Sequence, residues 1–176
     1  MKDNKYLKIA IVAIVIIGLV TATFFVGGSN SESEGSNNTF DPEVILANAK
    51  AESAAVKEEE KKAYTKISVA QYLDYYAGSE AKLILVGHDG CPYCQIANPI
   101  LQNLAYKYDI EINYLDTDEF TDETQTAFVQ SDEYFSSGFG TPLLFIVQNN
   151  TIIDVVDGLV DTALYTDFLT AYGYIK

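Results

Sequence analysis

The 176-residue chain contains no arginine and no tryptophan, a single histidine and only two cysteines. Eleven lysines stand against 25 aspartates and glutamates, which gives a formal net charge of −14. Because so acidic a chain repels phosphate backbones, we expect no nucleic-acid partner. A four-ligand zinc site needs more cysteine and histidine than the chain supplies. The charge favours encounters with cationic partners, although solubility alone also explains it.

Both cysteines lie in the stretch Gly90-Cys91-Pro92-Tyr93-Cys94, two residues apart. The segment before it, Lys82–His88, is apolar enough for a buried strand, and Gln95–Tyr108 after it has apolar residues at helical spacing. A Cys-x-x-Cys pair between a strand and a helix predicts a redox motif. The alternatives are a structural disulfide or half of a zinc site, and for zinc the chain adds only His88.

The position of this pair predicts a role for each cysteine. Free N–H groups at a helix start favour an anion, and the thiolate is the attacking form of cysteine. Cys91 would stand at that start, and Pro92 suits the first helical position because its missing N–H costs nothing there. Cys94 follows one turn later, close enough to attack a mixed disulfide at Cys91. We therefore predict Cys91 as the nucleophile and Cys94 as the resolving thiol.

Neighbouring residues are candidates for supporting roles. His88 and Pro92 are candidate modulators of Cys91 ionisation, although His88 is equally consistent with a surface residue at the strand end. Tyr93, between the cysteines, is expected to be exposed and to contact substrates. Phe135 and Phe139 either extend an apolar rim around the motif or pack the loop that contains them.

An uncharged run at residues 9–26 follows three lysines near the N-terminus. At 1.5 Å per residue it spans about 27 Å as a helix, close to the thickness of a hydrocarbon core. We predict an uncleaved, single-pass signal anchor in the cytoplasmic membrane, with cleavage and secretion as the alternative. The positive-inside rule places residues 1–8 in the cytoplasm and the rest of the chain outside.

Residues 27–63 are predicted to connect this anchor to a compact domain. The first part, 27–39, is small and polar and is typical of a flexible linker. Asp41 and Pro42 then begin a probable helix whose apolar face is mostly alanine. Such a face buries little surface, so we interpret the helix as a spacer rather than a core element. The compact domain is expected at residues 64–176.

The pattern within residues 64–176 predicts the element order β-α-β-α-β-α-β-β-α. A turn at 148–151 separates the last two strands, which is typical of a hairpin. Strands are expected at 64–67, 83–86, 111–115, 143–147 and 152–156, and helices at 68–78, 91–108, 122–129 and 161–174.

This order, with Cys-x-x-Cys after the second strand and a proline before the fourth, resembles the thioredoxin fold. The resemblance covers roughly Tyr64 to Lys176 and implies an α/β fold with a central mixed sheet flanked by helices. In that family a Thr-Pro pair with a cis peptide bond lies against the cysteines and helps to bind the substrate backbone. The resemblance implies this role for Thr141 and Pro142, whereas a proline opening a strand is the alternative explanation.

Two departures from thioredoxins bear on the chemistry. The chain has Cys-Pro-Tyr-Cys, whose central dipeptide is that of glutaredoxins, instead of Trp-Cys-Gly-Pro-Cys. Thioredoxins also carry a buried acid shortly before the first cysteine, where this chain has Leu85. Proton handling at Cys94 must therefore come from another group or from water.

Within the superfamily, the chain is similar to the bacteriocin transport accessory proteins of Gram-positive bacteria. The shared features are a membrane anchor, a strand ending in Val-Gly, the Cys-Pro-Tyr-Cys motif and a strand led by Thr-Pro. Those proteins resemble exported thiol oxidoreductases that help to form disulfides in secreted peptides.

Taken together, the sequence predicts a membrane-anchored, extracytoplasmic thiol–disulfide oxidoreductase. Its partners would be thiols and disulfides of secreted or surface proteins and a membrane redox partner of unknown identity, with no organic or metal cofactor. The exterior setting and Pro92 favour oxidase or isomerase work over reduction, but the reduction potential decides the direction. The alternatives are a binding module for export of a cationic secreted peptide, or a thiol-based metal carrier.

Overall fold

The structure of the protein is a computed structural model that describes residues 41–176. The predicted anchor at 9–26 and the polar linker at 27–39 lie outside these residues. Along the described part of the chain, the helices all fall short of the length and apolar character needed to cross a membrane.

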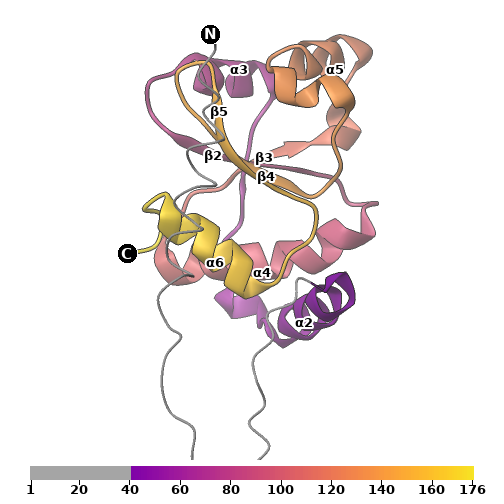
Figure 1. The fold of residues 1–176 in the computed structure, drawn as a ribbon, viewed down its shortest axis with the longest axis vertical. Coiled ribbons are helices and arrows are strands. Elements are labelled where there is room, and N and C mark those ends of the chain that lie inside the picture. Colours follow the sequence, from indigo (N-terminus) through magenta and orange to yellow (C-terminus); the bar gives the residue numbers. More distant parts are fainter. Residues whose placement is uncertain (1–40) are drawn as a thin grey trace, which may run out of the picture. The chain divides into compact units, whose positions relative to one another are not determined.

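A five-stranded mixed sheet forms the centre of the domain, with the strand order β1-β3-β2-β4-β5 (Figure 1). Its first three strands, β1 (Thr65–Lys66), β3 (Asn113–Asp116) and β2 (Lys82–Gly87), are parallel. The hairpin of β4 (Leu143–Val147) and β5 (Ile152–Asp157) adds two antiparallel strands. The predicted element order and the mixed sheet are confirmed.

Helices cover both faces of this sheet (Figure 1). On one face α4 (Pro92–Tyr108) and α6 (Thr162–Ala171) share a core with Leu83 and Leu85 of β2. On the other face α3 (Val69–Ala77) and α5 (Asp122–Val129) pack over Ile84 and Val86. Because alternate side chains of a strand point to opposite faces, the uninterrupted apolar run of β2 supplies both cores.

Most of the local signals work as predicted. Ser68 forms a capping box with Gln71 at the start of α3, and Asp161 caps α6. The loop at 131–140 differs from expectation because it contains a short 3-10 helix, η3 (Glu133–Ser137). Phe135 of η3 is fully buried and its ring centroid lies 4.5 Å from that of Phe128. These aromatic rings pack the loop and form no rim around the cysteines.

Helix α2 (Pro42–Ala55) begins as predicted but packs differently. Asp41 caps it by accepting a hydrogen bond from the Glu43 N–H at 2.9 Å. The spacer interpretation is wrong, because α2 packs on α4 and Ala49 is fully buried in the core that contains Leu101. Small alanine side chains let two helices approach closely, so a face of low hydrophobicity can still be buried. The compact unit therefore starts before α2 and not at residue 64.

Polar contacts also hold this N-terminal region on the domain. The Thr162 N–H and hydroxyl both donate to Glu52 Oε2, each at 2.8 Å. Glu52 thus adds a second carboxylate, besides that of Asp161, at the start of α6. After α2, the short 3-10 helix η1 (Glu58–Glu60) leads into a segment that runs along α4, where the Lys62 N–H donates to the Gln102 carbonyl at 3.1 Å. α2 is thus attached to both α4 and α6.

We expect Glu52→Ala to lower the free energy of unfolding by about 1 to 2 kcal/mol, because the helix start of α6 loses a charged acceptor. Glu52→Gln keeps an acceptor and should lose less. Urea unfolding followed by circular dichroism measures both variants, with the exposed Glu59→Ala as the control. Equal stability of Glu52→Ala and Glu59→Ala would contradict this attachment.

Candidate active site at the cysteine pair

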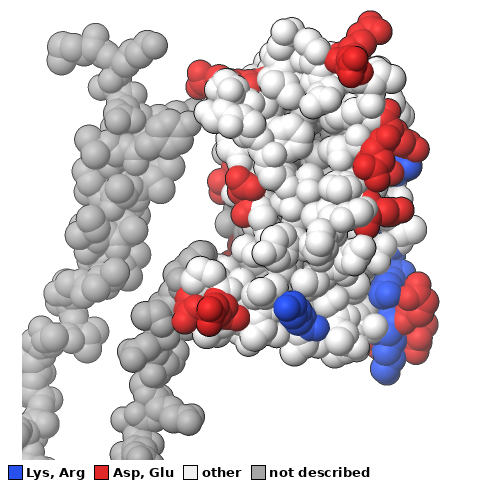
Figure 2. Space-filling view, turned by 90° about the vertical axis from the view of Figure 1, so that its right-hand side faces the viewer, with Lys and Arg blue, Asp and Glu red and all other residues white. Residues whose placement is uncertain are grey.

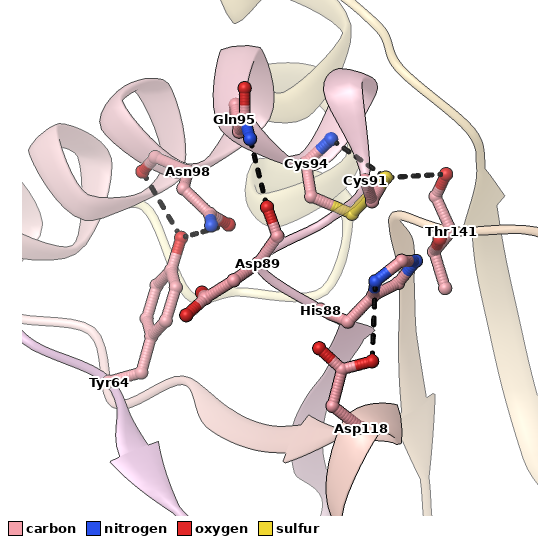
Figure 3. Close-up of a disulfide and its surroundings, with 9 residues drawn as sticks. All are labelled: Tyr64, His88, Asp89, Cys91, Cys94, Gln95, Asn98, Asp118 and Thr141. Atoms are coloured by element: carbon pink, nitrogen blue, oxygen red, sulfur yellow. Dashed lines mark hydrogen bonds and ion pairs between the residues drawn. A yellow bond between two sulfur atoms is a disulfide. The ribbon is translucent and has the colours of Figure 1, made fainter.

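The strand β2 ends directly before the cysteine motif, and α4 begins at it. Cys91 is the N-cap residue of α4 and Pro92 is its first helical residue, as the sequence predicts. The Cys91 N–H donates to the His88 carbonyl at 3.2 Å, and the Gln95 side-chain amide donates to the Asp89 carbonyl at 2.9 Å (Figure 3). The short connection between strand and helix is therefore held from both sides.

The two sulfur atoms are bonded as a disulfide, and the Cα atoms of Cys91 and Cys94 lie 5.2 Å apart. The Cys94 N–H, one of the free donors of the first helical turn, points at Cys91 Sγ with a distance of 3.0 Å (Figure 3). Cys91 keeps 6% of its surface exposed and Cys94 only 1%. The N–H at the helix start thus points at the sulfur of the more exposed cysteine. The division into nucleophile and resolving thiol stays a prediction.

The structure brings Thr141 and Pro142 to the cysteine pair, as the resemblance implies. Their peptide bond is cis, and the Thr141 carbonyl oxygen lies 3.4 Å from Cys91 Sγ (Figure 3). Pro142 is buried where β4 begins, and its carbonyl accepts a hydrogen bond from the Gly158 N–H at 2.9 Å. The loop after β5 therefore also borders the site. The role of these residues in substrate binding stays a prediction.

His88 faces a carboxylate that sequence reasoning did not predict. Its Nδ1 lies 3.5 Å from Oδ1 of Asp118, in the short helix η2 (Thr117–Glu119) at the end of β3 (Figure 3). A protonated imidazole would form an ion pair there. Its proposed influence on Cys91 stays a prediction. Tyr93 is 52% exposed, as expected.

Tyr114 of β3 is a polar group near Cys94 that sequence reasoning missed. A methyl group placed on Gly87 would lie 3.2 Å from Cys94 Sγ and 3.5 Å from the Tyr114 hydroxyl oxygen, so both atoms border the same small space. Tyr114 pairs with Leu85, the position where thioredoxins have an acid, and its ring centroid lies 5.5 Å from that of Tyr64. Only the pairing of β2 with β3 reveals this position, because the two strands are far apart in the sequence.

The electrostatic setting keeps the Tyr114 hydroxyl protonated. Burial, followed by the negative charges of Asp116 and Asp89, raises the pKa of Tyr114 to about 12. A phenol with that pKa is a neutral hydrogen-bond donor throughout the physiological pH range. The Tyr114 hydroxyl that borders the space over Gly87 is therefore neutral.

A mixed sheet of this topology, with a cysteine pair at the helix start and a cis-proline beside it, is the arrangement of a thioredoxin-like thiol–disulfide oxidoreductase. The chain belongs to the TraF family, described as "F plasmid transfer operon protein", whose match spans residues 39–160. This match begins before α2, in agreement with the extent of the compact unit. The more specific likeness to bacteriocin transport accessory proteins stays a prediction.

The chain is also similar to individual proteins. A protein of Brevibacillus choshinensis named "Disulfide bond formation protein" is 26% identical over 93 residues, which are 52% of this chain and 73% of that protein. Thioredoxin f2 of Chlamydomonas reinhardtii superposes with a TM-score of 0.51 at 12% identity, covering 65% of this chain and all of that one. A thioredoxin of Malassezia sympodialis reaches a TM-score of 0.48 at 17% identity, covering 63% and 92%. The likeness to thioredoxin f2 shows the fold.

In the reduced protein we expect iodoacetamide to alkylate Cys91 at least about ten times faster than Cys94. Cys91 is more exposed, and a hydrogen bond to a charged group contributes about 1.5 to 3 kcal/mol, which corresponds to a factor of about ten or more. Mass spectrometry of the singly alkylated protein at neutral pH assigns the site. Alkylation that is equal at the two positions, or faster at Cys94, would contradict the geometry.

Proposed function

We propose that the chain is an extracytoplasmic thiol–disulfide oxidoreductase that exchanges disulfides with secreted or cell-surface proteins. The observation that carries this proposal is the Cys91–Cys94 disulfide at the start of α4, with the Cys94 N–H on Cys91 Sγ. The printed name of the Brevibacillus choshinensis relative supports disulfide formation as the activity. The uncharged run at 9–26 behind three lysines supports a membrane anchor with the domain outside.

In the oxidase direction the reaction has two exchange steps. A substrate thiolate attacks Cys91 Sγ, the Cys91–Cys94 bond breaks, and its electron pair leaves on Cys94 Sγ. A second substrate thiolate then attacks the substrate sulfur of the mixed disulfide and releases the Cys91 thiolate, which the Cys94 N–H stabilises. The substrate is oxidised and the cysteine pair is reduced by two electrons, which a membrane redox partner accepts. Reduction is the same sequence in reverse.

In this mechanism Tyr114 provides Cys94 with a hydrogen bond and not with a proton, so proton exchange at Cys94 is left to water. The negative charge of the first step appears on Cys94, which is buried and needs a donor. The Tyr114 hydroxyl borders the same space as Cys94 Sγ and donates a hydrogen bond to the departing thiolate. Because its pKa is about 12, it stabilises the thiolate without giving up its proton.

The cis peptide segment and Tyr93 are proposed to hold the substrate. The Thr141 carbonyl lies beside Cys91 Sγ, so a substrate strand that reaches this sulfur passes along Thr141 and Pro142. Tyr93 adds an exposed ring between the two cysteines. These contacts align the attacking sulfur with the disulfide, and alignment is the main way in which a protein accelerates thiol exchange.

The alternatives remain distinguishable from this proposal. A passive binding module would keep its biological function when the cysteines are replaced. Across residues 41–176 no group of three or more His, Cys, Asp and Glu side chains is arranged to hold a metal ion, so a metal carrier would have to rely on the two thiolates.

Replacing Cys91 by Ser is expected to abolish catalysed oxidation of a reduced test protein. Reduced Cys94→Ser, mixed with a disulfide-bonded test protein, should instead accumulate a mixed disulfide at Cys91, visible by mass spectrometry without reducing agent, because no Cys94 thiol releases it. Accumulation at residue 94 in Cys91→Ser, with none at Cys91 in Cys94→Ser, would reverse the assignment. Unchanged biological function in both variants would favour the binding module.

Tyr114→Phe should slow formation of the mixed disulfide about tenfold, because a hydrogen bond to the departing thiolate is lost. The deficit should stay constant from pH 6 to pH 9, since Tyr114 with a pKa of about 12 remains protonated there. Stopped-flow measurement with a small thiol isolates this step, and Tyr106→Phe, at an exposed position of α4, is the control. Equal rates in the wild type and Tyr114→Phe would exclude the role.

A further inference from the structure

An apolar groove lies beside the cysteine pair and is not used by the mechanism above. It encloses about 640 Å³ between α2, the end of β5 and the loop that leads into α6, and Tyr93 lines it too. This volume is within the usual range for ligand sites. The groove is therefore a second feature of the molecule that points to a bound partner.

Tyr93 connects the groove with the disulfide. This residue stands between the two cysteines and belongs to the lining of the groove. Gly158 also lines the groove, and its N–H donates to the carbonyl of Pro142. The residue before Pro142 is Thr141, whose carbonyl contacts Cys91 Sγ. A chain that fills the groove therefore lies next to residues that border the cysteine pair.

The lining combines apolar and acidic side chains. Ile45 and Leu46 of α2 line the groove together with Val156 and Leu159, which pack on the same core as α2. The charged members are Glu43 and Asp157, both exposed, and Asp157 Oδ2 also accepts a hydrogen bond from the Tyr134 hydroxyl at 3.3 Å. None of the lysines within residues 41–176 is part of the lining. Figure 2 shows the same character more broadly, with acidic side chains outnumbering lysines around a wide uncharged area. Such a surface complements a ligand that is apolar and cationic.

We propose that this groove binds the segment next to the reactive cysteine of the substrate, and that it selects segments with apolar residues and a lysine or arginine. The inference rests on the proposed function and adds a substrate class to it. Both cysteines of this chain belong to the redox pair, so no other part of it supplies a reacting thiol. The polar stretch 27–39 carries Glu32 and Glu34, whose sign does not match the groove.

Helix α2 is what makes this groove selective. It precedes the part of the chain that resembles thioredoxin, so its side chains add a wall that the thioredoxin elements alone do not provide. The buried Ala49 and the contact of Glu52 with Thr162 fix that wall in place. Because this wall is already ordered, binding a flexible segment does not carry the entropic cost of ordering the wall.

The apolar part of the proposal is tested with the full chain and two synthetic peptides. Each peptide has one cysteine flanked by leucine and valine, and the two differ in carrying two lysines or two glutamates. Ile45→Ala combined with Leu46→Ala should lower kcat/KM for the lysine peptide at least about tenfold, since contacts of several methylene groups are lost. Val44→Ala is the matched control, because Val44 is an exposed neighbour on α2 outside the lining. Thermal unfolding verifies that the variants are folded.

The contribution of negative charge in the groove to the choice of peptide is tested at Glu43. Glu43→Lys should reduce the preference for the lysine peptide over the glutamate peptide about threefold or more, because an exposed attraction becomes a repulsion. Glu123→Lys makes the same charge change at an exposed position on α5, away from the groove. An equal loss in both variants would mean that only the overall charge matters, and would overturn the local role of the groove.

A small thiol such as dithiothreitol separates the two proposals, since it reaches the disulfide without filling the groove. If the wild type oxidises neither the small thiol nor the peptides, the oxidoreductase proposal itself fails. If it oxidises both and the α2 variants are indistinguishable from Val44→Ala, only the groove proposal fails.

A crosslink identifies the occupant. With p-benzoylphenylalanine in place of Tyr93, illumination should crosslink a labelled form of the lysine peptide to the full chain. Adding unlabelled lysine peptide should reduce this crosslinking. A crosslink to residues 1–40 of the same chain, or to a second copy, would show another occupant and overturn the proposal.

Discussion

The geometry of the candidate site depends on one contact, the N–H of Cys94 directed at the sulfur of Cys91. It exists because a helix leaves its first N–H groups without partners, and because the N-cap side chain is placed to accept from them. In this chain a cysteine takes the position that serine or aspartate usually occupies. The capping interaction that starts α4 and the interaction that favours a thiolate are therefore the same contact.

The surrounding structure serves to hold that contact at the edge of the sheet. β2 is buried on both faces, so its end is fixed, and the parallel neighbour β3 contributes Tyr114 beside it. The antiparallel neighbour β4 contributes the segment from Thr141 to Pro142 on the other side. Three adjacent strands thus deliver the groups that border the two sulfurs.

Much of this arrangement was predictable from sequence because its signals are local. The cysteine spacing, the proline after Cys91 and the starts of the helices near residues 68 and 161 each depend on a few neighbouring residues, and all appear where expected. Tyr114 and Asp118 could not be found in this way, since strand pairing brings them to the site from distant positions. The alanine face of α2 was misjudged because hydrophobicity underestimates how closely small side chains can pack.

The docking of α2 has a further consequence for where the enzyme can act. If residues 9–26 lie in a membrane, only residues 27–40 remain between the bilayer and the first residue of the domain, whereas an undocked α2 would leave 27–63. Fourteen residues span at most about 50 Å when fully extended. The domain would then work within a shallow layer above the lipid surface and meet chains as they emerge from the bilayer.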